Sequence, residues 1–291
     1  MRWRGRRQSD NVVDRRGSRG PGRKTVGGGA MIVLLLVSVF FGEDVSKILG
    51  LFIGGGGQHH YETSYSNSGY SSQGDATQGG GQQDEASQFV SVVLAETEDT
   101  WNTVFAQMGK NYQPPKLVLY TGQVSSACGL GQAQSGPFYC PGDYQIYLDL
   151  SFLQDLQRMG APGDSAFAYV IAHEVGHHVQ NVVGIADQVR AQQARSTQVQ
   201  SNALSVRLEL QADCLAGVWL NHTERRSSIL EEGDIEEGLA AAAAVGDDRI
   251  LSQAGRAVNR EAFTHGSSAE RVQWFKKGAR SGNIESCNTF V

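Results

Sequence analysis

The feature that most constrains the fold is an apolar stretch, residues 164–183, which carries two histidines and a glutamate at helical spacing. Asp164 follows Pro162-Gly163 and is predicted to be the N-cap of a helix that ends near Val183. The apolar residues of the stretch predict that this helix is mostly buried. They are Ala166, Phe167, Val170, Ala172, Val175 and Val179. Buried polar groups without partners are costly, so the fold must supply a partner for the histidines and the glutamate.

The polar residues of this helix form the motif His-Glu-x-x-His, with His173, Glu174 and His177. Positions four apart lie on one face of a helix, so both imidazoles can reach the same ion, while Glu174 lies beside that face. A divalent cation would compensate the burial of all three groups. His178 lies about 100° around the helix from His177 and is left out of the ligand set.

A third ligand is predicted downstream, because a catalytic zinc site has three protein ligands and leaves one position for water. Glu209 and Asp213 form another pair four residues apart, on a stretch with apolar neighbours. Glu209 is predicted to bind the metal. Asp213 is predicted to accept the outer N–H of an imidazole, that of His173. Without the upstream motif, this pair would be interpreted as an ordinary polar helix face.

HExxH followed by ExxAD resembles the gluzincin class of metallopeptidases. The wider chain resembles the bacterial family named "putative neutral zinc metallopeptidase". The segments that carry this resemblance are GPFYCP at Gly136–Pro141, YLDLSF at Tyr147–Phe152, HEVGHHVQ at His173–Gln180 and ELQADCLAGVW at Glu209–Trp219. The resemblance implies a membrane-anchored endopeptidase with one Zn²⁺ per chain, in which Glu174 is the general base and the substrate is a peptide or protein.

Thr264–Arg271 (THGSSAER) resembles the His-Pro…Arg segment of the CAAX-processing and heat-shock membrane endopeptidases. This resemblance implies that His265 stabilises the developing oxyanion and that Arg271 supports the metal ligands. Gly266 stands where that pattern has proline, so the loop conformation is expected to differ. The alternative is that His265 caps the helix that follows it.

The remaining patterns predict an α+β fold, a zincin-like metallopeptidase domain over residues 89–291 with a small sheet and mostly helices. Lys116–Thr121 and Tyr144–Asp149 are alternating, β-rich runs and predict strands. Tyr144–Asp149 is further predicted to be an edge strand on which an extended peptide aligns. Further helices are predicted over residues 187–222 (with one break), 234–245 and 268–280, and the spacing of Phe89, Val92, Val93, Trp101 and Phe105 predicts one more before the first strand.

The N-terminal third differs in composition. Residues 1–25 are Arg- and Gly-rich without apolar periodicity and are predicted to be a disordered basic tail. Residues 26–53, which include the uncharged run Val26–Gly42, are predicted to be a single transmembrane helix with its flanks. Residues 54–88 are predicted to be a flexible Gly/Ser/Gln linker. Because basic flanks stay on the cytoplasmic side, the N-terminus is expected in the cytoplasm and the catalytic domain outside.

Charge and cysteine content narrow the function further. Residues 1–24 hold nine Lys/Arg and two Asp, so the net charge of −5 leaves −12 for the rest of the chain. An acidic domain argues against a nucleic-acid partner.

Cys128 and Cys140 flank a Gly-rich loop that they can close, which leaves Cys214 and Cys287 to pair with each other. The alternative is four buried thiols.

A second function remains open, namely a metal-stabilised but catalytically silent binding or scaffold protein of the cell envelope. Glu174 argues against it, because a purely structural metal site needs no base beside an open coordination position. The sequence predicts neither the peptide that is cut nor the oligomeric state.

Overall fold

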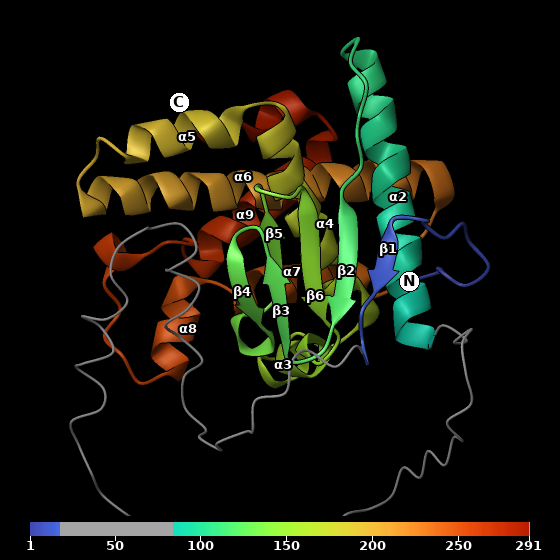
Figure 1. The fold of residues 1–291 in the computed structure, drawn as a ribbon, viewed down its shortest axis with the longest axis horizontal. Coiled ribbons are helices and arrows are strands. Elements are labelled where there is room, and N and C mark those ends of the chain that lie inside the picture. The colour runs from blue at the N-terminus through green and yellow to red at the C-terminus, as the bar shows by residue number, and fades with distance from the viewer. Residues whose placement is uncertain (18–83, 291) are drawn as a thin grey trace, which may run out of the picture.

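The computed structural model describes residues 1–17 and 84–290, and these form an α+β protein with a small sheet and mostly helices (Figure 1). The predicted fold class is confirmed at this level. The predicted transmembrane anchor, residues 26–53, lies outside the described residues, and so does most of the predicted linker. Within the described ranges, no helix is both long and apolar enough to cross a membrane.

The main sheet has four strands in the order β1-β2-β6-β5. β1 (Val12–Asp14) and β2 (Lys116–Tyr120) run parallel to β6 (Gln145–Asp149), while β5 (Phe138–Cys140) is antiparallel to β6. The two strands predicted from sequence are therefore present. A separate hairpin of β3 (Gln123–Ser126) and β4 (Gly129–Gln132) stands beside the sheet.

The prediction that Tyr144–Asp149 is an edge strand is wrong. β6 pairs with β2 on one side and with β5 on the other, so its backbone groups are already used in the sheet. Alternation of apolar residues indicates a strand but does not indicate its place in the sheet, which depends on long-range partners. In the described part of the chain, the edge strands of the main sheet are β1 and β5.

The helices pack on the sheet and on one another. Their bounds are α2 Glu85–Gln107, α3 Phe152–Arg158, α4 Asp164–Val182, α5 Ile185–Gln193, α6 Gln198–Ser227, α7 Asp234–Ala244, α8 Asp247–Gln253 and α9 Ser268–Ser281. Short 3₁₀ turns cover Ala133–Ser135, Arg260–Ala262 and Ile284–Cys287. The predicted break in the long helical stretch separates α5 from α6. Asp164 is the first residue of α4 rather than its N-cap, which is Gly163.

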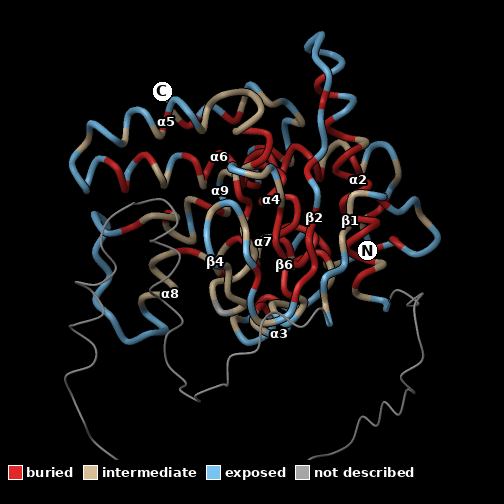
Figure 2. Tube along the Cα trace, in the orientation of Figure 1, coloured by how far each residue is buried: buried red, intermediate tan, exposed pale blue. Residues whose placement is uncertain are grey.

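The core lies between the sheet and the crossing helices, where the buried backbone of Figure 2 is continuous through α2, α4, β2 and β6. Its largest enclosed side chains include Trp101, Trp219 and Phe167, and each such side chain contributes about 1.5–3 kcal/mol when it is fully buried. α6 and α9 approach most closely at Gly278, where an added Cβ would lie 1.9 Å from the carbonyl oxygen of Cys214. This close approach brings the C-terminal half of α9 beside the middle of α6.

Residues 1–17 are ordered, which corrects the prediction of a disordered tail over residues 1–25. Trp3 is only 6% exposed and packs edge-on against Phe89 of α2, with ring centroids 5.4 Å apart. The arginines form ion pairs with acidic residues of α2, among them Arg7 with Glu98 at 3.0 Å. The composition of the segment suggested disorder because it does not reveal partners that lie far away in the sequence, such as Phe89 and Glu98. Residues 18–25 lie outside the described part.

The structure also moves the predicted start of the folded domain. α2 begins at Glu85, and the carboxylate of Asp84 accepts a hydrogen bond from the backbone N–H of Ser87 at 2.8 Å as its N-cap. Residues 84–88, predicted to end the linker, therefore belong to the first helix of the domain.

Both predicted disulfides are present, Cys128–Cys140 and Cys214–Cys287. The first closes the β3–β4 hairpin region against β5. The second fastens the 3₁₀ turn at the C-terminus to the middle of α6. No cysteine of the chain is left as a free thiol.

Candidate metal centre

The helix α4 that carries the motif is held on its sheet side by His178. The Nε2 of His178 donates to the carbonyl oxygen of Gln113 at 2.7 Å, and its Nδ1 lies 3.1 Å from the hydroxyl of Tyr139 on β5. Asn181 donates to the same hydroxyl at 3.0 Å. Burial lowers the pKa of His178 to about 4, so the ring is neutral at pH 7. His178 thus has a structural role, in agreement with its exclusion from the predicted ligand set.

On the opposite side of α4, the three predicted metal ligands converge. The Nε2 of His173 lies 3.2 Å from Oε2 of Glu209, and the Nε2 of His177 lies 3.4 Å from Oε1 of the same residue. One ligand atom from each of the three residues lies within 4.8 Å of the other two. Two turns of α4 and one turn of α6 therefore present two imidazoles and a carboxylate to a common point.

The other nitrogen of His173 fixes its orientation. Nδ1 lies 2.9 Å from Oδ1 of Asp213, and the carboxylate is ionised, so this nitrogen carries the proton. Burial raises the pKa of Asp213, but Arg271 and His173 outweigh burial and lower it. The Nε2 of His173 is then available as a ligand, as predicted for the pair His173–Asp213.

Gln180 fixes the orientation of His177 in the same way. Its Oε1 lies 2.9 Å from Nδ1 of His177, and its Nε2 donates to the carbonyl oxygen of Leu208 at 2.7 Å. Because a carbonyl oxygen only accepts, the amide has to present its oxygen to His177, and Nδ1 of His177 has to donate. In the neutral form of each ring the proton is therefore on Nδ1, and Nε2, which faces Glu209, is the nitrogen that can bind a metal.

A buried ion pair supports Asp213 from behind. Arg271 of α9 donates through Nε to Oδ2 of Asp213 at 2.8 Å and through Nη2 to Oδ1 at 2.9 Å. The hydroxyl of Tyr169 also donates to Oδ1 of Asp213. Arg271 Nη2 lies 3.7 Å from Oε2 of Glu209, so its charge also reaches the third ligand. Arg271 occupies the supporting position that the sequence resemblance implied.

The electrostatic environment favours a cation between the three ligands. Burial lowers the pKa of His173, but Asp213 and Glu209 outweigh burial and raise it to about 9. Burial raises the pKa of Glu209, but His177 and His173 outweigh it and lower that pKa well below the usual range. The site therefore holds a carboxylate that stays ionised and favours a positive charge beside it, which a proton on His173 supplies and a metal ion can supply in its place.

Glu174 follows His173 on α4 and is almost fully buried. Its carboxylate forms no hydrogen bond or ion pair with the residues that the structure describes, in contrast to Asp213 and Glu209. A buried carboxylate without a partner is costly, and a catalytic role is one reason for a protein to retain such a group. Its position beside the ligand face is the one predicted for a general base.

His265 lies in the loop before α9, and Asp247 at the start of α8 holds it. Asp247 accepts from the backbone N–H of His265 at 2.6 Å and lies 3.1 Å from Nδ1 of the ring. Burial lowers the pKa of His265, but Asp247 and the nearby charge of Glu209 raise it. Gly266, the next residue, lies against the side chains of Val206 and Leu210 of α6, so the loop that carries His265 lies beside the turn of α6 that carries Glu209.

The capping alternative for His265 does not hold. The N-cap of α9 is Ser267, which forms a capping box with Glu270. Gly266 has φ +88°, a conformation that proline cannot adopt, so the expected difference from the His-Pro pattern is present.

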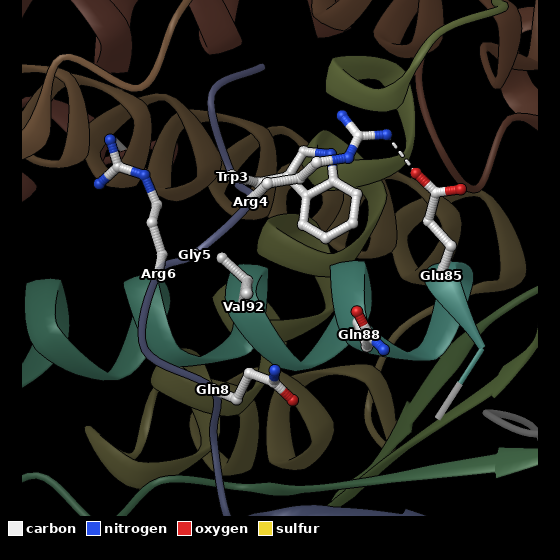
Figure 3. Close-up of a pocket in the computed structure, with 8 residues that line it drawn as sticks. All are labelled: Trp3, Arg4, Gly5, Arg6, Gln8, Glu85, Gln88 and Val92. Carbon is white, nitrogen blue, oxygen red and sulfur yellow. Dashed lines mark hydrogen bonds and ion pairs between the residues drawn. The ribbon is translucent and has the colours of Figure 1, made fainter. Parts of the chain in front are cut away.

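Two other features lie apart from this centre. Asp164, Asp234 and Glu237 also cluster, but the nitrogen of Met1 lies 3.0 Å from Asp164 and 3.3 Å from Asp234 and gives them a cationic partner. A cavity of about 460 Å³ lies between the N-terminal segment and α2, and none of the metal-site residues lines it (Figure 3).

Three residues of the site were not predicted, namely Tyr169, Gln180 and Asp247. Tyr169 lies four residues before His173, and Gln180 lies three residues after His177, so both share a helix face with a ligand. That spacing is a signal from which both could have been found. Asp247 has no such signal, because its contact with His265 depends on how the α7–α8 connection folds.

Comparison with known proteins agrees with a zinc-binding role for this site. The profile of the family described as "Putative neutral zinc metallopeptidase" matches residues 1–290, so the chain belongs to this family. The protein "Uncharacterized protein YpfJ" of Escherichia coli K12 is 48% identical over 300 residues, which cover 100% of this chain and 99% of the relative. "Uncharacterized protein Rv2575" of Mycobacterium tuberculosis H37Rv is 41% identical over 217 residues, or 71% of this chain and 72% of the relative. No solved structure matches the chain.

The residues present fit the zinc that the family implies. Two imidazole nitrogens with fixed tautomers and one ionised carboxylate are a ligand set used by catalytic zinc sites, which keep a fourth position open. Each of the two histidines has an outer partner, Asp213 for one and Gln180 for the other.

Proposed function

We propose that the chain is a zinc-dependent endopeptidase, in which His173, His177 and Glu209 bind the metal and Glu174 is the general base. The observation that carries this proposal is the convergence of the two Nε2 atoms on the Glu209 carboxylate. Zinc in a three-ligand site of this kind supplies Lewis-acid activation of water and of a carbonyl group.

The side chains of the protein supply the proton transfers. Glu174 takes a proton from the water that attacks the peptide carbonyl, and then delivers a proton to the amine that leaves. Its burial beside the ligand face, without a competing hydrogen-bond partner, supports this role. Asp213 and Gln180 keep the two imidazoles in the orientation in which Nε2 is unprotonated.

His265 is proposed to stabilise the negative charge on the carbonyl oxygen during attack. Asp247 lies against Nδ1 of His265 and so fixes the orientation of the imidazole ring. A fixed donor contributes more to such stabilisation than a mobile one. The packing of Gly266 on Leu210, next to Glu209, supports a location of His265 near the metal ligands.

Peptide alignment is proposed to occur along β5 rather than β6. β5 is at the edge of the main sheet and is linked to α4 through Tyr139. An extended peptide can add to such an edge by main-chain hydrogen bonds. Proline substitution of Phe138, which would remove a backbone donor of β5, is expected to raise KM if this assignment is right, and an unchanged KM would contradict it.

Membrane attachment and an extracytoplasmic location are also proposed. The uncharged run Val26–Gly42 supports attachment, and the two disulfides support an oxidising compartment. Sedimentation of the protein with membranes, lost when residues 26–53 are deleted, would support the first point, and a soluble full-length protein would contradict it.

The function itself is tested by zinc content and hydrolysis together. Full-length protein is expected to bind one zinc ion and to cleave an unstructured protein substrate, and Glu209→Ala is expected to lose both. The alternative, a silent metal-binding scaffold, predicts bound zinc in the wild type without hydrolysis of any peptide in a diverse library.

A further inference from the structure

A chain of hydrogen bonds runs from a metal-site histidine to a disulfide. Gln180 holds Nδ1 of His177 through its oxygen, and its Nε2 lies 3.1 Å from Oε1 of Gln211. Gln211 in turn donates through its own Nε2 to the carbonyl oxygen of Cys287 at 3.0 Å. The contacts from Gln180 to Gln211 and from Gln211 to Cys287 are buried, so water does not compete for them, while His177 is partly exposed.

The directions of these bonds depend on one another. Cys287 supplies a carbonyl oxygen that only accepts, so Gln211 has to present its amide nitrogen there and its oxygen to Gln180. Gln180 then has to present its own nitrogen to Gln211 and its oxygen to His177. The carbonyl oxygen of Leu208 accepts from the same amide nitrogen of Gln180 at 2.7 Å, so two fixed acceptors, at Leu208 and at Cys287, together set the tautomer of His177.

The fixed acceptor owes its place to the disulfide. Cys287 lies in the 3₁₀ turn Ile284–Cys287 and is bonded to Cys214 in the middle of α6. Cys214 directly follows Asp213, which holds the other metal-site histidine. The disulfide thus ties the carbonyl group that Gln211 contacts to the turn of α6 that carries Asp213.

We infer that Gln180 and Gln211 are positioning residues of the zinc site, and that the Cys214–Cys287 disulfide acts on metal affinity through them. This inference rests on the zinc site of the proposed function and adds a coupling to it. Loss of an outer partner of a metal-binding histidine weakens metal affinity by about 10–100-fold. The disulfide is expected to act in the same direction, because without it the carbonyl of Cys287 is no longer held against Gln211.

The test measures zinc affinity by competition with a chromophoric chelator in full-length variants. Gln180→Met and the pair Cys214→Ser/Cys287→Ser are each expected to bind zinc about 10–100-fold more weakly than wild type. The matched control is Cys128→Ser/Cys140→Ser, which removes the disulfide that has no hydrogen-bonded path to a ligand and is expected to keep wild-type affinity. Gln211→Met serves as a second probe of the chain if the double serine variant does not fold.

A double-mutant cycle separates positioning from general loosening of the fold. If the disulfide acts through Gln180, the variant that combines Gln180→Met with the two serines binds zinc no more weakly than Gln180→Met alone. The visible spectrum of the cobalt-loaded protein is expected to change in Gln180→Met and in Gln211→Met, because the geometry of His177 changes.

The outcomes separate this inference from the proposed function. Wild-type protein that binds no zinc overturns both. Wild-type protein that binds zinc, with unchanged affinity in Gln180→Met or with additive effects in the cycle, overturns the coupling and leaves the proposed function intact.

A second inference concerns the N-terminal segment, residues 1–17, and depends on different contacts. β1 continues the main sheet, with the N–H of Leu117 donating to the carbonyl of Asn11 at 2.9 Å and that of Arg15 to Leu119 at 2.8 Å. Before β1, the segment runs along α2, where Arg4 points toward Glu85 in Figure 3. The segment is thus an integral part of the sheet and of the surface that covers α2.

The buried acids of α2 are matched to this segment. Arg6 pairs with Glu96 at 3.2 Å, and Glu98 accepts from Asn11 at 2.8 Å as well as from Arg7. At the other end, Arg16 pairs with Asp84, the N-cap of α2, at 2.6 Å. Basic residues that the sequence suggested for a cytoplasmic flank therefore have their partners within the folded domain.

We infer that residues 1–17 and the domain of residues 84–290 lie in the same compartment of the cell. A segment that supplies a strand of the sheet cannot be on the other side of a membrane from that sheet. This replaces the expectation that the Arg-rich N-terminus and the catalytic domain lie on opposite sides, and it excludes a single membrane crossing between residues 17 and 84, so the membrane attachment proposed above does not depend on one spanning helix.

The test uses two single-cysteine probes in the full chain, since all native cysteines are paired. Gln8→Cys reports on the N-terminal segment, and Gln157→Cys, on the exposed end of α3, reports on the domain. In spheroplasts treated with a membrane-impermeant maleimide, both sites are expected to be labelled together, either before lysis or only after it. Labelling of one site before lysis and of the other only after lysis would overturn the inference.

Discussion

Arg271 and Asp213 form an ion pair that is enclosed almost completely where α9 crosses α6. Their side chains are 3% and 0% exposed, and two of their atom pairs lie 2.8 and 2.9 Å apart. Oδ1 of Asp213 is also the atom that lies against Nδ1 of His173. The pair therefore links the packing of two helices to the orientation of a metal ligand.

Replacing Arg271 by Met should lower the free energy of unfolding by about 3–5 kcal/mol, because it leaves the carboxylate of Asp213 buried without its main partner. Arg190→Met is the matched control, since its ion pair with Asp187 is largely exposed and is worth about 0–1 kcal/mol. Urea unfolding in the presence of a chelator measures both. Equal losses in the two variants would contradict the role of the buried pair.

Asp213→Asn should weaken zinc binding by about 10–100-fold, because a neutral amide holds the Nδ1–H of His173 less firmly. Asp143→Asn is the control, since that carboxylate accepts from Tyr147 and from two backbone N–H groups away from the metal ligands. Chelator competition reports both affinities. A weakening of similar size in the control would show that the effect is not local.

Acid should destabilise the fold partly through His178. Its ring is surrounded by Tyr112, Tyr139 and Tyr144 and by the carbonyl of Gln113, and its pKa is lowered from 6.5 to about 4. Between these values the unfolded chain binds the proton and the folded protein does not. The stabilisation is therefore complete above pH 6.5 and is lost as the pH falls toward 4, by about 3 kcal/mol in total.

The measurement for this prediction is the free energy of unfolding at pH 4.5 and pH 7 with a chelator present, so that metal release does not contribute. His178→Gln should show a smaller difference between the two pH values than wild type. An identical difference in the two proteins would mean that His178 does not titrate in this window.

His265→Gln should lower kcat by about 10²–10³-fold if His265 stabilises the oxyanion, with zinc content unchanged. Asp247→Asn should lower kcat less, since it loosens the ring without removing it. Arg260→Met, in the 3₁₀ turn before this loop, is a suitable control, since its ion pair with Glu270 is exposed on the Arg260 side and does not involve His265. Loss of zinc in His265→Gln would instead indicate a role in metal binding.

The metal-site residues could be predicted because helical spacing alone places them. Residues four apart on an apolar helix share a face, so His173 with His177 and Glu209 with Asp213 each specify one side of a helix. α4 and α6 face each other because the buried polar side chains of both helices need partners in the core. The disulfides were predictable for a related reason, because four cysteines without a CxxC pair leave few other arrangements.

The N-terminal segment could not be predicted in this way. Val12 and Val13 are two apolar residues in an Arg-rich stretch, too few to show a period. Their strand forms because β2 offers an edge more than 100 residues later, and Glu96 and Glu98 offer charges that the basic residues match. The prediction that β6 is an edge strand is wrong for the same reason, because strand order depends on long-range partners and not on the local pattern of residues.

The central claim is that this protein holds a zinc ion for catalysis by Glu174. The most direct measurement is zinc content alongside peptide hydrolysis in full-length wild type and in Glu174→Gln. The structure predicts one zinc ion per chain in both proteins, with hydrolysis in the wild type and a loss of kcat of at least about 10²-fold in the variant. Wild-type activity in Glu174→Gln, or zinc-loaded wild type that cleaves no peptide, would contradict it.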